Sequence, residues 1–424
     1  MPVSPSAVTV PEPINIFTCT PNLLQWWLQR LQMWIVRWPR WFATRIFSRE
    51  PHATSLKRLN ILYTAAWLRV NRFPRHPDWP REPRPYRFML FSSNFAGGWD
   101  PYRQAYLDTL PQGIKTLWGH STTYPGYPRR HTRYVTEDWL LFRLPRPHHY
   151  YYAYSGFAPN DIRAALRLYR ELTAVALAPT TADDNRADHR AIRRQSLRRL
   201  AVIAQDCLAG TEPGRVTPCA VFGPRSASGL SGFASLVPIL PGSEDDVRHM
   251  IDRLGAVEQS PFRHVPGTHF ARLGVLDRRR AAFHPKRTIE LRTSWLMLVV
   301  DFDGAFGLDE SRARRISDGE VRRYAREMDR HSALRQVWSH CYGFNALRSL
   351  EDLLAPSVVD RFVYFRDYPD TTLREISAAV KVQRRFVTMV KEDRLDEDAA
   401  IAALAAELQE RLARRIPQRD PALP

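Results

Sequence analysis

Two related stretches decide the fold: Phe88–Phe95 reads FMLFSSNF, and Leu296–Phe302, in the second half of the chain, reads LMLVVDF. Each is an apolar run of strand length that is followed by a turn containing glycine. A Trp-x-His motif comes later in both halves, at Trp118–His120 and at Trp338–His340. This recurrence indicates that one structural unit occurs twice in the chain.

The elements around the second stretch follow a defined order. We expect strands at 233–240, 269–276, 295–302 and 361–365, helices at 244–254 and about 318–331, and a further helix at 373–390. The order βαββαβ is the ferredoxin-like plan, an antiparallel four-stranded sheet with two helices on one face. We expect the strand at 361–365 to close this unit.

The first half repeats the later part of the same order. We expect strands at 65–70, 87–95 and 149–154, the last one closing the first unit, and a helix at 160–176. An opening strand and helix are not evident, and the segment before residue 20 reads as a Pro-rich lead. The predicted fold class is therefore α+β, with two ferredoxin-like antiparallel sheet units carrying helices on their outer faces, plus an N-terminal amphipathic helix.

This interpretation divides the chain into five parts. They are a Trp- and Arg-rich amphipathic segment at 1–57, a first, incomplete unit at 58–178, a basic helix and linker at 179–232, a second unit at 233–392, and a C-terminal helix and tail at 393–424. The loop GPRSASGLSG at 223–232 is rich in glycine and serine, which favours a linker.

The layout resembles the dimeric α+β-barrel superfamily over residues 58–390. That superfamily includes duplicated proteins such as dye-decolourising peroxidases and chlorite-dismutase-like haem proteins. The resemblance is one of architecture, because the Gly-x-x-Asp-Gly signature of the peroxidases is absent and the nearest segment, 300–304, reads VDFDG. The resemblance implies that haem is a possible cofactor, with His340 or His120 as its axial ligand or as a proton carrier.

The N-terminal segment has the composition of a membrane-surface helix. Its apolar residues recur at helical spacing, and the residues expected at the interface are Trp27, Trp34 and Trp38 with Arg30 and Arg37. Indole rings suit the headgroup boundary, and guanidinium groups meet anionic phosphate. The alternative is that the stripe packs on the body of the protein.

Composition restricts partners and compartment. The 62 Lys and Arg outnumber the 44 Asp and Glu, for a net charge of +18, which favours anionic partners such as an acidic membrane surface. The four cysteines are widely spread, so a reducing, cytoplasmic compartment is expected. No long uncharged apolar run is present, and no aromatic RNA-binding signature supports nucleic acid as a partner.

Four polar residues are candidates for a site. Duplication places His120 and His340 at related positions, where imidazole can shuttle protons or bind a metal, although the sequence defines no metal site. Asn94 and Asp301 leave the two repeated strands at the same place, with Asn94 as an orienting donor and Asp301 or Asp303 as a general base or an oxygen ligand. Turn formation alone also explains both pairs. His269 and Arg272 lie on one predicted strand, and alternation places them on opposite faces.

The leading functional hypothesis is a peripherally membrane-associated, cytoplasmic-side protein that binds an apolar or amphipathic small molecule between its two sheets. A haem-dependent or cofactor-free oxidoreductase of the α+β-barrel type is the first alternative. A non-catalytic scaffold for an acidic partner is the second. The sequence decides neither catalysis nor oligomeric state, and it carries no phosphate loop or nucleophile elbow.

Overall fold

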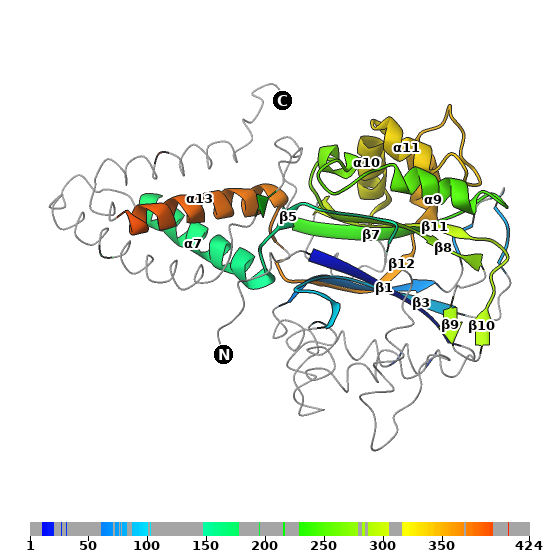
Figure 1. Ribbon diagram of the computed structural model, residues 1–424, viewed down its shortest axis with the longest axis horizontal. Helices are drawn as coiled ribbons and strands as arrows, with labels where there is room; N and C mark the ends of the chain where they lie inside the picture. Colours follow the sequence, from blue (N-terminus) through cyan, green and yellow to red (C-terminus); the bar gives the residue numbers. More distant parts are fainter. Residues whose placement is uncertain are drawn as a thin grey trace, which may run out of the picture.

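The computed structural model describes residues 11–20, 61–70, 87–100, 147–177, 229–278, 287–304, 316–368 and 370–392, with shorter stretches and single positions between them. Within these residues the fold is α+β and is built on two antiparallel four-stranded sheets. The two sheets lie one above the other, and helices cover the outer face of the second (Figure 1).

The first sheet draws three strands from the first half of the chain and one from the second. Its order is β1 (Pro11–Thr20), β3 (Arg87–Ala96), β2 (Leu62–Val70) and β12 (Asp360–Arg366). The opening strand that seemed absent from the sequence is therefore present as β1. It is an edge strand, where proline is tolerated because one side of the strand needs no ladder hydrogen bonds.

The second sheet has the matching order. Its strands are β7 (Gly229–Pro238), β11 (Trp295–Gly304), β8 (Thr268–Leu276) and β4 (His149–Tyr152). Strand β7 begins inside the segment that we expected to be a linker. All ten residues of β7 and of β11 are buried, because one face of the sheet meets the other sheet and the opposite face meets helices.

The closing strands are exchanged between the sheets. We expected β4 to complete the first unit and β12 to complete the second, but β4 pairs with β8, and β12 pairs with β2. The segment just before β12 first touches the second sheet, where Val359 N–H donates to Ala234 O at 2.9 Å, and the chain then crosses to the first sheet. Each sheet is thus completed by a strand from the other half.

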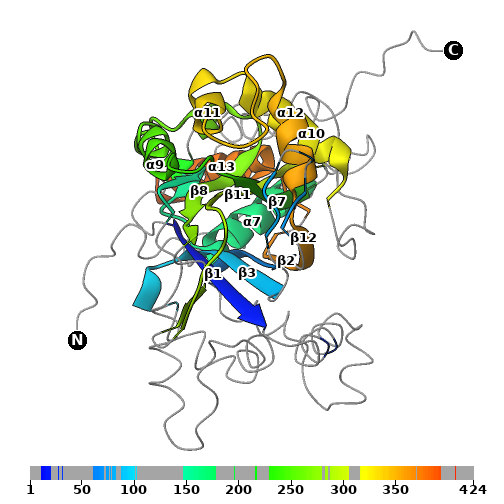
Figure 2. The same ribbon diagram turned by 90° about the vertical axis from the view of Figure 1, so that its right-hand side faces the viewer.

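Four helices cover the outer face of the second sheet (Figure 2). They are α9 (Glu244–Asp252), α10 (Asp318–Asp329), α11 (Ser332–Val337) and α12 (Leu350–Leu354). Acidic residues fill the first turn of α9, where they complement the positive end of the helix dipole. Tyr324 of α10 packs against Phe302 of β11 with ring centroids 4.5 Å apart. The strands and helices expected in this half are confirmed to within a few residues.

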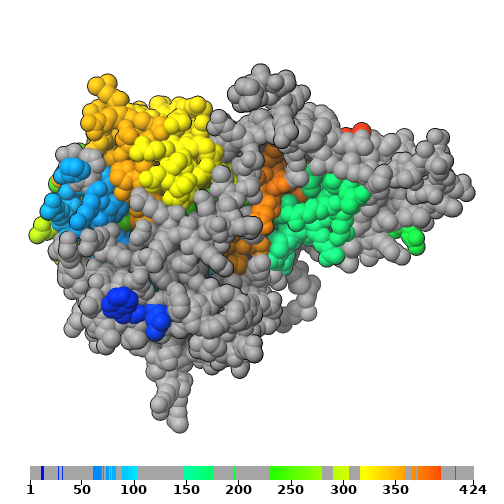
Figure 3. Space-filling view, turned by 180° about the vertical axis from the view of Figure 1, so that it is seen from behind, coloured from blue at the N-terminus to red at the C-terminus, as the bar shows by residue number. Residues whose placement is uncertain are grey.

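A helical pair extends from one end of the two-sheet body. Helix α7 (Pro159–Leu177) packs along α13 (Leu373–Lys391), and the pair is visible as the green and orange groups that project in Figure 3. Thr372 and Glu375 form a capping box that fixes where α13 begins. Arg163 of α7 pairs with Asp367 at 2.6 Å, at the base of the pair. Two short two-stranded ribbons are also described. One pairs β5 (Tyr154–Ser155) with β6 (Arg215–Val216), and the other pairs β9 (Ala282–His284) with β10 (Arg287–Ile289).

Candidate functional site

The ends of the two repeated strands meet between the sheets. Asn94 of β3 and Asp301 of β11 are both buried, and Asn94 Nδ2 donates a hydrogen bond to Asp301 Oδ2 at 2.7 Å. Strand alternation directs both side chains toward the facing sheet, and both residues lie near the carboxyl end of their strand. The two residues that the sequence aligned across the repeat are therefore in direct contact.

These two residues belong to a cluster that we call the inter-sheet polar cluster. Its members are Thr64, Asn94 and Tyr364 from the first sheet and Tyr150, Arg272 and Asp301 from the second. Each sheet contributes three side chains, one from each of three strands. The cluster therefore joins the sheets by hydrogen bonds within their shared core.

Asn94 is the centre of the cluster, because its amide bonds to four other side chains. Nδ2 donates to Thr64 Oγ1 at 2.7 Å and to Asp301. Oδ1 accepts from Arg272 at 2.6 Å and from the hydroxyl of Tyr150 at 3.0 Å. The hydrogen-bonding capacity of a primary amide is then fully used. Asn94 therefore lies between a buried guanidinium and a buried carboxyl and is bonded to both.

The carboxyl of Asp301 is held by donors from the opposite sheet. Thr64 Oγ1 donates to Oδ2 at 2.9 Å, and the hydroxyl of Tyr364 donates to Oδ1. Gly232, paired with Asp301 on β7, leaves the space for this contact, since a Cβ there would lie 2.6 Å from Asp301 Oδ1. Burial raises the pKa of Asp301, against the opposing effects of the Tyr364 hydrogen bond and the Arg272 charge.

Arg272 brings a cation into the same layer. Its side chain is 1% exposed, and its second guanidinium nitrogen donates to Ser93 O at 3.1 Å. Burial lowers the pKa of Arg272, while Tyr150 and Asp301 oppose that shift. Burial also raises the pKa of Tyr150. The cluster thus places a carboxyl, a guanidinium and a phenol in one desolvated environment, as many binding and catalytic sites do.

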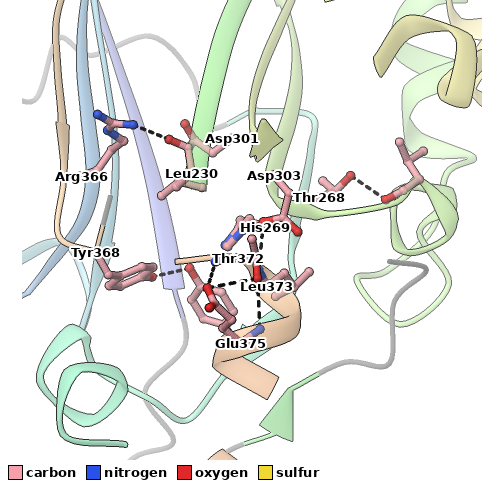
Figure 4. Close-up of polar contacts among 12 residues, drawn as sticks. Leu230, Thr268, His269, Asp301, Asp303, Arg366, Tyr368, Thr372, Leu373 and Glu375 are labelled. Atoms are coloured by element: carbon pink, nitrogen blue, oxygen red, sulfur yellow. Dashed lines mark hydrogen bonds and ion pairs between the residues drawn. The ribbon is translucent and has the colours of Figure 1, made fainter. Parts of the chain in front are cut away.

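A second polar group lies further along the same layer, around His269. His269 Nε2 lies 2.8 Å from Asp303 Oδ1, and the backbone N–H of Leu373 donates to the same oxygen at 2.9 Å (Figure 4). We expected His269 and Arg272 on opposite faces of the strand. The pairing of β8 with β11 shifts register at Asp301/Phe302, so His269 has no partner residue on β11. This bulge turns the His269 side chain to the same side as Phe270, and the imidazole and the phenyl ring both contact Tyr154.

Aromatic side chains fill the space between these polar groups. Tyr63 packs on Phe270 with ring centroids 5.4 Å apart, and Tyr154 packs on Phe270 at 5.2 Å. The hydroxyls of Tyr154 and Tyr368 contact each other, and the hydroxyl of Tyr63 donates to Phe157 O. Burial raises the pKa of Tyr63, Tyr154 and Tyr368, so these phenols stay neutral.

The Trp-x-His residues are elsewhere or outside the described structure. His340 lies on the helical side of the second sheet, where its carbonyl accepts from Leu240 N–H at 2.9 Å and its Nδ1 is 3.9 Å from Asp246. The neighbouring Trp338 is fully buried. His340 therefore contacts the outer helical layer rather than the cluster. His120 lies outside the described residues, so its proposed partnership with His340 stays a prediction.

Neither His340 nor His269 fits the axial ligand of a haem. The side chain of His340 is 32% exposed and faces a carboxylate, while the Nε2 of the buried His269 is engaged by Asp303. Within the described ranges, no three His, Cys, Asp or Glu side chains gather into a group that could hold a metal ion. No reaction step through haem follows from these residues.

Of the residues expected at a membrane interface, Trp27 is described, at a helical position. Its side chain is 52% exposed, as is that of Leu31 one helical turn later. Trp34, Trp38, Arg30 and Arg37 lie outside the described residues. Among the helices that the structure describes, none has the length and apolar character needed to cross a bilayer.

Comparison with known proteins finds no matching family model and no match among curated proteins. The fold class and the buried polar groups are therefore the basis for any functional statement. Repeat alignment identified Asn94 and Asp301. It missed Thr64, Tyr150 and Tyr364, which carry no motif.

Proposed function

We propose that the protein binds an apolar or amphipathic small molecule in the layer between its two sheets. The observation that carries this proposal is the inter-sheet polar cluster, in which Asn94 bridges the buried groups Arg272 and Asp301. The matching strand orders of the two sheets further support an internal duplication of a ferredoxin-like unit, as in the dimeric α+β-barrel proteins.

The energetics of the cluster favour a role in binding over a role in stability alone. Removing a carboxylate and a guanidinium from water has a large desolvation cost, and apolar replacements of similar volume are often as stable or more stable. Buried groups with shifted pKa values also concentrate at functional sites. Asp301 and Arg272 have such shifts, in opposite directions, within one layer.

The surroundings suit the apolar part of a ligand. Phe270 lies between Tyr63 and Tyr154 and stacks at 6.5 Å on Tyr150 of the cluster. Aromatic walls with a few fixed polar groups are the usual lining of small-molecule sites. An alkyl chain or ring would contact this aromatic group while its polar end approaches the hydrogen-bonding side chains.

Binding can be tested by isothermal titration calorimetry with two eight-carbon probes, 1-octanol and octanoate. We expect at least one probe to bind with one-to-one stoichiometry. Asn94→Ala should weaken that binding about tenfold, since this amide holds the other side chains of the cluster in place through four hydrogen bonds. Asn160→Ala, at an exposed position of α7, is the matched control. Binding of neither probe to the wild-type protein, or equal binding by the Asn94 and Asn160 variants, would contradict the proposal.

We also propose that the protein acts at an anionic, cytoplasmic membrane surface. The exposed side chains of Trp27 and Leu31 and the net charge of +18 support this location. Co-sedimentation with phosphatidylserine-containing vesicles should fall when Trp27, Trp34 and Trp38 are replaced by serine. Leu347→Ser, which removes an apolar side chain that is 94% exposed elsewhere, should leave sedimentation unchanged. Equal losses in both variants would argue against a specific role of the tryptophans.

A further inference from the structure

Hydrogen bonds fix the tautomer of His269. Asp303 Oδ1 accepts the backbone N–H of Leu373, so this oxygen acts as an acceptor. His269 Nε2, 2.8 Å from the same oxygen, must then be the donor. A neutral imidazole carries one N–H, so the proton on Nε2 leaves Nδ1 as an unprotonated acceptor.

The Nδ1 atom of His269 has no hydrogen-bond partner among the described residues. The side chain is fully buried, so bulk water does not satisfy it. A buried polar atom left without a partner is energetically unfavourable, and such an atom usually marks the place of a bound water, ion or ligand. Asn94, in contrast, has all four of its hydrogen bonds. The Nδ1 atom of His269 can therefore accept a hydrogen bond from a ligand in this layer.

The environment of Nδ1 selects a chemical class of ligand. An unprotonated nitrogen accepts a hydrogen bond and donates none, so it suits a hydroxyl group. A carboxylate would meet a lone pair on Nδ1 and the nearby charge of Asp303. The ring of Tyr154 stands edge-on to the imidazole, with centroids 6.0 Å apart, and provides an apolar neighbour.

We propose that His269 and Asp303 form the polar end of the inter-sheet site and select a hydroxyl-bearing amphiphile, whose O–H donates to His269 Nδ1. This inference rests on the proposed binding function and names its ligand class. Asp303 acts as a positioning residue, because it holds the imidazole through Nε2 and so leaves Nδ1 as the acceptor of the neutral ring.

Nitrogen-15 NMR of the histidine side chains tests the tautomer without any ligand. The His269 signals, assigned by their absence in His269→Gln, should show Nε2 protonated and Nδ1 unprotonated. Adding 1-octanol should shift the Nδ1 signal toward the hydrogen-bonded range, and octanoate should not. A proton on Nδ1 in the free protein, or an Nδ1 signal already hydrogen-bonded to a tightly held water and unchanged by octanol, would overturn the inference.

Calorimetry separates this inference from the broader proposal. His269→Gln keeps a donor near Asp303 but removes the Nδ1 acceptor, so it should weaken 1-octanol binding about tenfold and leave octanoate binding unchanged. His149→Gln changes another buried histidine, which lies 2.8 Å from Ser260, and should leave both affinities unchanged. If 1-octanol binds equally to wild type and His269→Gln, the ligand class is wrong while inter-sheet binding stands. If neither probe binds to wild type, both proposals fail.

Discussion

Asn94 and Asp301, which the sequence aligns across the two halves of the chain, are joined across the sheet interface by a 2.7 Å hydrogen bond. An amide and a carboxyl are complementary where two carboxyls would repel. The difference between the two repeated strands at this position is therefore what allows their ends to meet in the core.

Replacing the amide of Asn94 by a second carboxyl should test this complementarity through its effect on stability. Asn94→Asp removes the donors to Thr64 and Asp301 and places two acids side by side, so the free energy of unfolding should fall by about 3 kcal/mol or more. The double variant Asn94→Asp/Asp301→Asn restores one amide and one acid with their places exchanged. Urea unfolding followed by circular dichroism should find it more stable than Asn94→Asp alone. Simple addition of the two single effects would show that the residues are not coupled.

The carboxyl of Asp301 predicts a dependence of stability on pH. Its pKa is raised in the folded protein by burial, so above the ordinary value of 3.8 the unfolded chain releases a proton that the folded chain retains. The free energy of unfolding of the wild type, measured relative to Asp301→Asn, should therefore fall as the pH rises above about 4. The difference should level off once the pH exceeds the folded pKa. A difference that does not change with pH would mean that Asp301 has an ordinary pKa.

His149 predicts the opposite trend. Burial lowers its pKa from 6.5 to about 4, so between these values the unfolded chain binds a proton that the folded chain does not. Stability should fall as the pH drops through this window, by up to about 3 kcal/mol for this one group. His149→Gln should lack that part of the loss. Parallel curves for the two proteins in chemical denaturation from pH 7 to pH 4 would contradict the prediction.

Gly232 predicts a steric effect at the cluster. A Cβ at this position would lie 2.6 Å from Asp301 Oδ1 and 2.8 Å from the hydroxyl of Tyr364, so Gly232→Ala should destabilise the fold by about 1–3 kcal/mol. Gly319→Ala is the matched control. It lies in the first turn of α10, where a Cβ would have nothing within 4 Å, so alanine should be neutral or stabilising there. Thermal unfolding of both variants distinguishes crowding from a general effect of replacing glycine.

The sequence predicts most strands and helices here because their local signals are strong. Strand β11 is a continuous apolar run, and α13 begins at a capping box, so both were placed within two residues. Strand β1 was missed because Pro11 and Pro13 resemble a lead segment. Proline is acceptable there because β1 is an edge strand that pairs with β3. The edge position of a strand is known only once the sheet is assembled.

The partners of the closing strands could not be read from the sequence. Alternation states which side chains share a face, but it does not state which strand lies alongside. The register shift at His269 could not be read from the sequence either, because a bulge depends on the pairing with the neighbouring strand. Asn94 and Asp301 were identifiable through their repeated context, whereas Thr64 and Tyr364 join the site only because β2 and β12 become neighbours.

The exchange of β4 and β12 also has a consequence for biosynthesis. The edge of β2 is capped by Asp360–Arg366, a segment that is synthesised long after β2 and β3. Until then the first sheet presents an unpaired edge, which is the kind of surface that pairs with other chains. Assembly of the first sheet therefore depends on synthesis of the second half, and neither half, expressed separately, would contain all the strands of its own sheet.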